Sequence, residues 1–191
     1  MLIFGPDEKV MKNTKNFLSS KFDMKDLGEA DLILGMKINK TAHGLALSQS
    51  HYVESIIKKF NFFSEEPLGI AYGSSVHLKK NKGNGIEQTK YAKIIGSVMY
   101  LMNCIRPDIA YAISRLSKYI HNPSQEHWNA LSRLMRYLKG TVNVGIYFTS
   151  HPNVLKGYCD ANWVFNNDET NSTGGYMFPL GGGAISWRSA K

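Results

Sequence analysis

The spacing of apolar residues along the first fifty positions alternates between strand-like and helical. The opening run MLIFG at 1–5 is typical of a short strand. Behind Asp7, apolar side chains recur at roughly helical spacing over 8–22, which predicts a helix capped by that aspartate. Alternating apolar and polar residues over 31–49 then bracket a turn at Thr41–Gly44, and this pattern predicts a β-hairpin.

The middle of the chain is expected to hold one helix, a linker and three further helices. Ser50 is predicted to cap a helix whose apolar face extends to Phe60. Residues 64–88 contain proline, glycine and the run HLKKNKGNG in place of a hydrophobic period, which indicates a linker. The later helices are predicted over about 89–104, from Pro107, and from the cap Ser124 to Gly140.

The C-terminal part of the chain is predicted to be β-structure. The runs VGIYF, VLKGYCDA, GGYMFPL and AISWRS have strand character, and Gly181–Gly183 is expected to form a hairpin turn. Separate groups of helices and strands indicate an α+β fold. The order of elements places no helix after these strands, so we expect one face of their sheet to be open to water.

The charge balance bears on the choice of partner. The sequence has 23 Lys and Arg residues against 15 Asp and Glu, a formal net charge of +8. Such a balance favours a polyanionic partner, although a basic globular protein with no nucleic-acid role has the same composition. No run of about 18 uncharged apolar residues and no secretory leader pattern is found, so no membrane association is predicted and the expected location is the cytoplasm or the nucleus.

Seven basic residues are candidate contacts to a nucleic-acid backbone. They are Lys58, Lys59, Lys79, Lys80, Arg133, Arg136 and Lys139. Lysine and arginine bind nucleic acid by neutralising phosphates and releasing counterions, but the same side chains on a solvated face need no function, and both interpretations stay open. The RPD motif raises a similar choice, because Arg106 either belongs to a capped helix start or is free to bind a phosphate or carboxylate.

The strongest candidate for chemistry is Asp160, which follows a predicted strand in the stretch GYCDANW. A carboxylate at a strand end can hold Mg²⁺, but Mg²⁺ chemistry on phosphodiesters usually needs several carboxylates around two ions. Taken alone, Asp160 also fits a residue that ends a strand in a turn. His121 and His127 lie six positions apart, whereas zinc sites on helices use spacings of three or four.

Long blocks of the sequence resemble one known family. The blocks are FDMKDLGEADLILGMKI, LSQSHYVESIIKKF, IIGSVMYLMNCIRPDIAYAISRLSKY, HWNALSRLMRYLKGT, GYCDANW, TGGYMF and AISWRSAK. In content and order they are similar to the Pol polyprotein of copia-type LTR retrotransposons, especially those of plants. The resemblance covers nearly the whole chain. It weakens over about 67–90, where the family usually has a Thr-Pro turn and this chain has PLGIAYGSS.

The resemblance implies a division of the chain into parts of two enzymes. Residues 1–66 resemble the end of a reverse transcriptase palm and the start of its thumb, 67–88 form a linker, and 89–141 resemble the helical thumb and connection. Residues 142–191 resemble the N-terminal part of an RNase H-like domain. In the family the polymerase copies RNA into DNA with Mg²⁺ and RNase H cuts the RNA of the hybrid. The implied partners are an RNA–DNA hybrid or other nucleic acid and the remainder of the polyprotein.

By the same resemblance, Asp160 matches the first catalytic carboxylate of RNase H and would be a Mg²⁺ ligand. The family's other carboxylates match positions outside 1–191: two aspartates directly precede the segment matching MLIFG, and a glutamate lies on the helix after the third RNase H strand. We therefore expect neither polymerase nor RNase H activity from this chain alone, and no stably bound Mg²⁺. The alternative hypothesis is a non-catalytic remnant that binds a nucleic-acid backbone.

Overall fold

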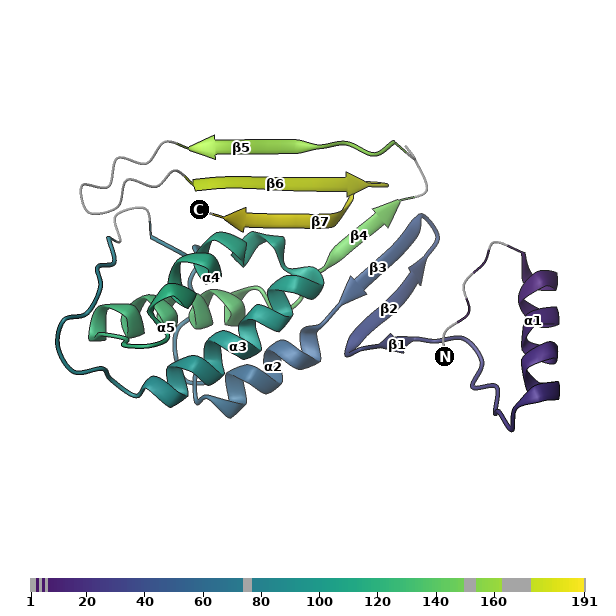
Figure 1. Cartoon of the computed structure of the whole chain (residues 1–191), viewed down its shortest axis with the longest axis horizontal. Helices are drawn as coiled ribbons and strands as arrows, with labels where there is room; N and C mark the ends of the chain where they lie inside the picture. The colour runs from purple at the N-terminus through teal and green to yellow at the C-terminus, as the bar shows by residue number, and fades with distance from the viewer. Residues whose placement is uncertain are drawn as a thin grey trace. The chain divides into compact units, whose positions relative to one another are not determined.

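The chain is seen in a computed structural model that describes residues 3, 5, 7–73, 77–149, 154–162 and 173–190, with only the backbone described at 161, 162, 173 and 190. It forms two compact units, Met1–Asp31 and Leu32–Lys191 (Figure 1). The second unit mixes helices with antiparallel strands, which confirms the predicted α+β class. The strand predicted at 1–5 falls largely outside the described residues.

The first unit contains α1 (Glu8–Lys21) and the segment that follows it. Asp7 caps this helix as predicted, because its carboxylate accepts a hydrogen bond from the Lys9 backbone N–H at 2.8 Å. An ion pair of 3.0 Å between Lys15 and Asp26 joins the helix to the segment after it. No residue of α1 is fully buried, and Val10 and Phe17 are largely exposed to solvent within this unit.

The second unit begins with a four-stranded antiparallel sheet in the order β1-β2-β3-β4. Its strands are β1 (Leu32–Ile33), β2 (Met36–Thr41), β3 (Gly44–Ser48) and β4 (Ile146–Thr149). β2 and β3 form the predicted hairpin. β4 comes from beyond the helices and pairs with β3, where Leu47 lies opposite Ile146. Glycine is required at Gly44, the first residue of β3, because a Cβ there would collide with the Phe148 carbonyl of the neighbouring strand.

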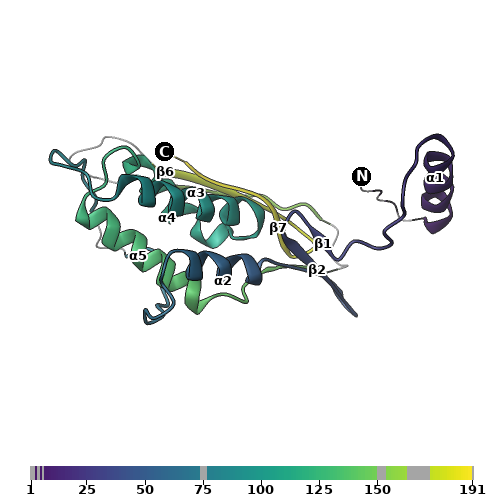
Figure 2. The same cartoon turned by 90° about the horizontal axis from the view of Figure 1, so that it is seen from below.

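Four helices build the hydrophobic core of the second unit. They are α2 (Ser50–Lys59), α3 (Gln88–Ile105), α4 (Ala110–Leu116) and α5 (Gln125–Gly140), with 3₁₀ turns η1 (Pro107–Ile109) and η2 (Ser117–Tyr119). α2 packs on α3 and α5, and α4 packs on the same two helices (Figure 2). Ile94, Leu131 and Leu134 are fully buried there. Burying such an aliphatic side chain stabilises the fold by about 1.5–3 kcal/mol, so these apolar faces hold the helices together. Among the described residues, no helix is long and apolar enough to cross a membrane.

In the second unit, the helix starts confirm one predicted cap and correct another. Ser124 caps α5 in a capping box with His127, whose ring Nδ1 accepts the Ser124 backbone N–H at 2.8 Å. The cap predicted at Ser50 was wrong by one residue: Gln49 precedes α2 and Ser50 is its first residue. The hydroxyl that serves this helix start belongs to Ser48, at the end of β3, and it accepts the Ser50 N–H at 3.3 Å.

The segment predicted as a linker is irregular but packed. Its described residues contain no helix or strand before α3. Leu78 is nevertheless buried, and the hydroxyl of Tyr119 donates a hydrogen bond of 2.9 Å to its carbonyl. Lack of hydrophobic periodicity therefore predicted the absence of regular structure correctly, while the packing of Leu78 depends on contacts with residues far along the chain.

The C-terminal strands form a second antiparallel sheet in the order β5-β6-β7. Its strands are β5 (Tyr158–Asn162), β6 (Thr173–Leu180) and β7 (Gly183–Ala190). The expectation that no helix covers it needs correction, because β7 contacts α4 and η1 (Figure 1). Trp187 packs against the helical core and its indole N–H donates to the Met102 carbonyl at 3.1 Å. Tyr158, Tyr176 and Ile185 remain exposed, so the cover is partial.

Candidate nucleic-acid interface

A groove of about 550 Å³ lies between α5 and the irregular segment before α3. Its polar side is a stripe on α5 whose members recur every three or four residues: Glu126, Asn129, Arg133 and Arg136. Leu68 and Leu78 line the groove from the irregular segment. The helical period therefore brings two of the predicted basic residues, Arg133 and Arg136, into one cavity.

Two of the predicted cations are engaged in holding the fold together. Arg136 donates from Nε to the Glu66 carbonyl at 2.6 Å. Lys139 donates from Nζ to the carbonyls of Phe63 and Glu65 at 2.6 and 2.7 Å. All three carbonyls belong to the chain just after α2, so these side chains fasten that segment to α5. Arg136 and Lys139 thus have a structural role that neither sequence interpretation included.

The other predicted lysines are exposed. Lys58 and Lys59 lie in the last turn of α2, and Lys79 and Lys80 directly follow Leu78, which lines the groove. The ammonium of Lys59 lies 5.4 Å from the centre of the Phe60 ring. Exposed lysines on rigid or packed backbone are suited to contact phosphates, which position a protein on nucleic acid without reading sequence.

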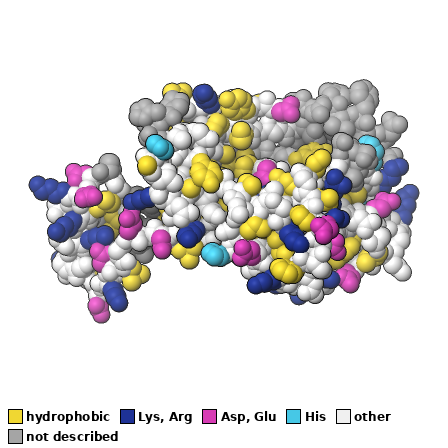
Figure 3. Space-filling view, turned by 180° about the vertical axis from the view of Figure 1, so that it is seen from behind, with side chains coloured by type: hydrophobic (Ala, Val, Ile, Leu, Met, Phe, Trp, Pro, Cys, Tyr) yellow, Lys and Arg dark blue, Asp and Glu magenta, His cyan; other side chains and the backbone are white. Residues whose placement is uncertain are grey.

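Acidic side chains accompany the basic ones at this interface. Glu126 lies in the groove, and the Glu65 carboxylate is 3.9 Å from Nε of Arg136. On the face shown in Figure 3, lysine and arginine side chains alternate with aspartate and glutamate. The basic side chains therefore do not form a uniform patch on this face.

Asp160 lies on β5, opposite Gly175 of β6, and is exposed. Gly175 pairs in turn with Ser189 of β7, so the neighbours across the sheet supply no second carboxylate. Among the residues that the structure describes, no three His, Cys, Asp or Glu side chains gather as a metal site requires. The exposed carboxylate fits a single Mg²⁺ ligand, and its role as one stays a prediction.

Arg106 is not free to bind a ligand, because its side chain is completely buried. Its Nε and Nη2 donate to the Asp108 carboxylate at 2.9 and 2.7 Å, and Nη2 also donates to the Thr141 hydroxyl. Burial favours the protonated acid, but the hydrogen bonds and charge of Arg106 outweigh it and hold the pKa of Asp108 below its ordinary value. The RPD motif therefore begins a helical turn, η1, as the structural interpretation predicted, although no side chain caps it.

The Arg106 network also includes Tyr137, whose hydroxyl donates to Asp108 at 2.8 Å. It joins η1 to the end of α5, where Thr141 follows the last helical residue. The sequence offered one signal for this network, the acid placed two residues after an arginine at a helix start. Nothing in the sequence pointed to the partners on α5.

Comparison with known proteins places the chain in a class. Residues 1–72 match the family described as reverse transcriptase (RNA-dependent DNA polymerase). The chain is 41% identical over 199 residues to the retrovirus-related Pol polyprotein from transposon TNT 1-94 of Nicotiana tabacum, covering 99% of this chain and 15% of that protein. It is 37% identical over 193 residues to the Pol polyprotein from transposon RE2 of Arabidopsis thaliana, covering 100% of this chain and 13% of that one.

A shorter relative aligns with most of its own length. It is an uncharacterized mitochondrial protein of Arabidopsis thaliana, 32% identical over 192 residues. The alignment covers 100% of this chain and 79% of that protein. No solved structure matches the chain. The chain belongs to the reverse transcriptase-containing Pol polyprotein family of plant copia-type transposons. It spans about 15% of the length of the tobacco relative.

Proposed function

We propose that this chain is a nucleic-acid-binding segment of a transposon Pol polyprotein. The segment binds the phosphate backbone of an RNA–DNA hybrid. The observation that carries the proposal is similarity to Pol polyproteins over the whole chain, joined to exposed lysines at positions 58, 59, 79 and 80. A hybrid is a dense array of phosphates, and exposed lysines bind it by releasing counterions.

The division implied by the sequence resemblance is part of the proposal. Residues 1–66 are assigned to the end of the palm and the start of the thumb, and 89–141 to the helical thumb and connection. The packing of the four helices α2, α3, α4 and α5 against one another supports the assignment to a helical thumb. Residues 142–191 are assigned to the start of an RNase H-like domain. An antiparallel three-stranded sheet with Asp160 on its first strand supports that assignment.

Binding to a fluorescent RNA–DNA hybrid, followed by anisotropy, tests the proposal. A variant carrying Lys58→Gln, Lys59→Gln, Lys79→Gln and Lys80→Gln should bind the hybrid at least about tenfold more weakly than the unmodified chain. A matched control also removes four exposed lysines, at positions 9, 12, 21 and 25 of the first unit, each replaced by glutamine. It should bind within about twofold of the unmodified chain. Equal affinities for the first variant and the unmodified chain would contradict the proposal.

We also propose that Asp160 contributes one carboxylate to a Mg²⁺ site that needs further groups from the polyprotein. Because such chemistry requires several carboxylates around two ions, residues 1–191 alone should leave a hybrid uncleaved with Mg²⁺ present. The measurement is gel analysis of a labelled RNA strand, with Asp160→Asn run alongside. Cleavage that this substitution abolishes would show that the chain is active by itself. Cleavage that survives it would indicate a contaminating nuclease.

A further inference from the structure

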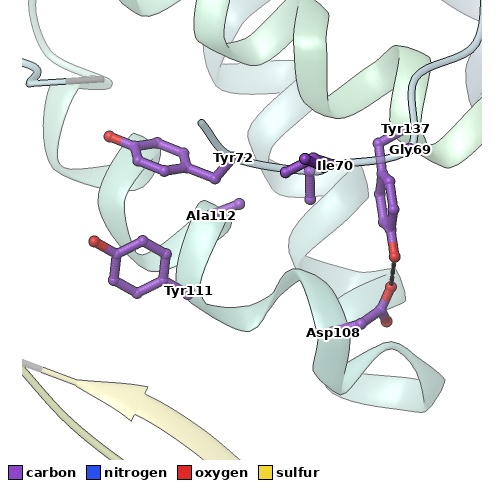
Figure 4. A pocket seen from close by; sticks show the side chains of 8 residues that line it. Gly69, Ile70, Tyr72, Asp108, Tyr111, Ala112 and Tyr137 are labelled. Carbon is purple, nitrogen blue, oxygen red and sulfur yellow. Dashed lines mark hydrogen bonds between the residues drawn. The ribbon is translucent and has the colours of Figure 1, made fainter. Parts of the chain in front are cut away.

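A second cavity, of about 310 Å³, opens between the start of α4, the irregular segment at 69–72 and α5 (Figure 4). Its main lining side chains are Ile70, Tyr72, Asp108, Tyr111, Ala112 and Tyr137. Two tyrosine rings lie at one end, the Asp108–Tyr137 pair lies at the other, and Ile70 and Ala112 lie between them. We name this cavity the tyrosine cleft.

The aromatic end of the cleft is built from rings that are distant in sequence. Tyr72 and Tyr111 meet edge to face, with ring centres 5.4 Å apart. Tyr111 is 43% exposed, so a large part of its ring is open to solvent. Arg115, one helical turn further along α4, forms a hydrogen bond with the Tyr72 hydroxyl. Arg115 also interacts electrostatically with Tyr111, so a guanidinium lies near both rings at this end.

The opposite end of the cleft carries a fixed acceptor. Arg106 and Tyr137 orient the Asp108 carboxylate through hydrogen bonds of 2.7 to 2.9 Å. The Asp108 side chain is still 31% exposed, so its carboxylate can accept from a donor that enters the cleft. The charge of Arg106 keeps that carboxylate ionised and acceptor-only at neutral pH.

An apolar floor with an open aromatic ring and an anionic acceptor suits one kind of ligand, a flat ring with hydrogen-bond donors on its edge. Nucleobases have this form, and they stack on tyrosine regardless of identity. Carboxylates accept from exocyclic amino groups of bases. Oδ2 of Asp108 already accepts from Arg106 and Tyr137, so Oδ1 is the oxygen left to accept from a ligand. Guanine has two donors on one edge, and either of them can bond this oxygen, whereas uracil has one donor between two carbonyl oxygens that a carboxylate repels.

We propose that the tyrosine cleft binds one unpaired nucleobase, stacked on Tyr111 with its donor edge toward Asp108 and with guanine preferred over uracil. The inference rests on the proposed nucleic-acid-binding function. The guanidinium of Arg115 beside the ring favours a strand with phosphates over a peptide as the occupant. Duplex nucleic acid keeps its bases paired, so the cleft acts only on single-stranded segments.

Anisotropy with labelled single-stranded RNA tests this inference on the full chain. The probes are a twelve-nucleotide oligouridine and the same strand with one central guanine. Tyr111→Ala should weaken binding of the guanine strand by about 5- to 100-fold, whereas Tyr111→Phe keeps the ring and should retain the affinity. Tyr147→Ala is the matched control, because Tyr147 is also an exposed tyrosine but lies on β4, outside the tyrosine cleft.

Binding of the same variants to the RNA–DNA hybrid distinguishes a failure of this inference from a failure of the proposed function. Tyr111→Ala should bind the hybrid as the unmodified chain does, because backbone contacts do not use the cleft. Equal affinity of Tyr111→Ala and the unmodified chain for the guanine strand would overturn the inference, as would equal affinity for the two strands. Loss of hybrid binding in Tyr111→Ala would also overturn it, by showing that Tyr111 acts through the fold. Hybrid binding with no single-strand binding would reject a base and leave a peptide as the occupant.

Discussion

At the scale of single residues, the stability of the helical core depends on one buried charge. Arg106 is fully buried and its guanidinium is satisfied by Asp108 and Thr141. A buried charge without its partner is costly, since the protein interior cannot replace the lost water. The ion pair therefore offsets the cost of burying Arg106 in the core and adds little stability beyond that.

Replacing Asp108 should expose that dependence. Asp108→Ala leaves Arg106 buried without its counter-charge, so we expect the free energy of unfolding to fall by about 3–5 kcal/mol. Tyr137→Phe removes one hydrogen bond from the same charged carboxylate and should cost about 1.5–3 kcal/mol. Urea unfolding of both variants measures the difference. Equal losses for the two variants would mean that the charge pair does not matter to the core.

The same pair gives stability a defined pH dependence. Because the folded state lowers the pKa of Asp108 below its ordinary 3.8, the unfolded chain binds the proton more readily. The contribution of Asp108 is therefore present above pH 3.8 and is lost as the pH falls through the lower, folded value. Asp108→Ala should lose stability less steeply than the unmodified chain over that acidic range, as urea unfolding at several pH values would show.

At the scale of elements, the two helix starts that looked alike in sequence differ in structure. Ser124 is a true cap of α5, while Ser50 is the first residue of α2 and makes no capping bond. Ser124→Ala should therefore lower the free energy of unfolding by about 1 kcal/mol. Ser50→Ala should change it by less than about 0.5 kcal/mol. A larger loss for Ser50→Ala than for Ser124→Ala would contradict the assignment of the caps.

Most helices and strands could be predicted from the sequence because their signals are local. The apolar period marks α3 and α5, and alternation around a turn marks the β2–β3 hairpin. Pairings between distant segments have no such signal. The return of β4 to β3 and the docking of Trp187 on the helical core depend on contacts across much of the chain. The cap of α2 was misplaced because Ser48 and Ser50 are equally suitable by residue type.

The candidate site shows the same limit. The basic residues were identified as candidates from residue type and clustering, but the bonds of Arg136 and Lys139 to carbonyls after α2 were not predicted. Those carbonyls lie some seventy positions away. The tyrosine cleft gave no sequence signal at all, because Tyr72 and Tyr111 meet only after the irregular segment packs on α4.

At the scale of the whole molecule, the net charge of +8 bears on association and not on the fold. Acidic side chains accompany basic ones on the face in Figure 3, so binding should come from a limited set of lysines. Each phosphate that a lysine neutralises contributes a slope of about −0.9 to the dependence of log affinity on log salt. A binding segment and a merely basic protein differ in this slope.

The most direct test is therefore to measure the affinity for the RNA–DNA hybrid at increasing salt concentrations. The two proteins compared are the unmodified chain and the variant with glutamine at positions 58, 59, 79 and 80. The account predicts that affinity falls steeply with salt for the unmodified chain. It also predicts that the variant's slope is shallower by about one unit for each lysine that contacts a phosphate. Absent binding, binding that ignores salt, or identical slopes for the two proteins would contradict it.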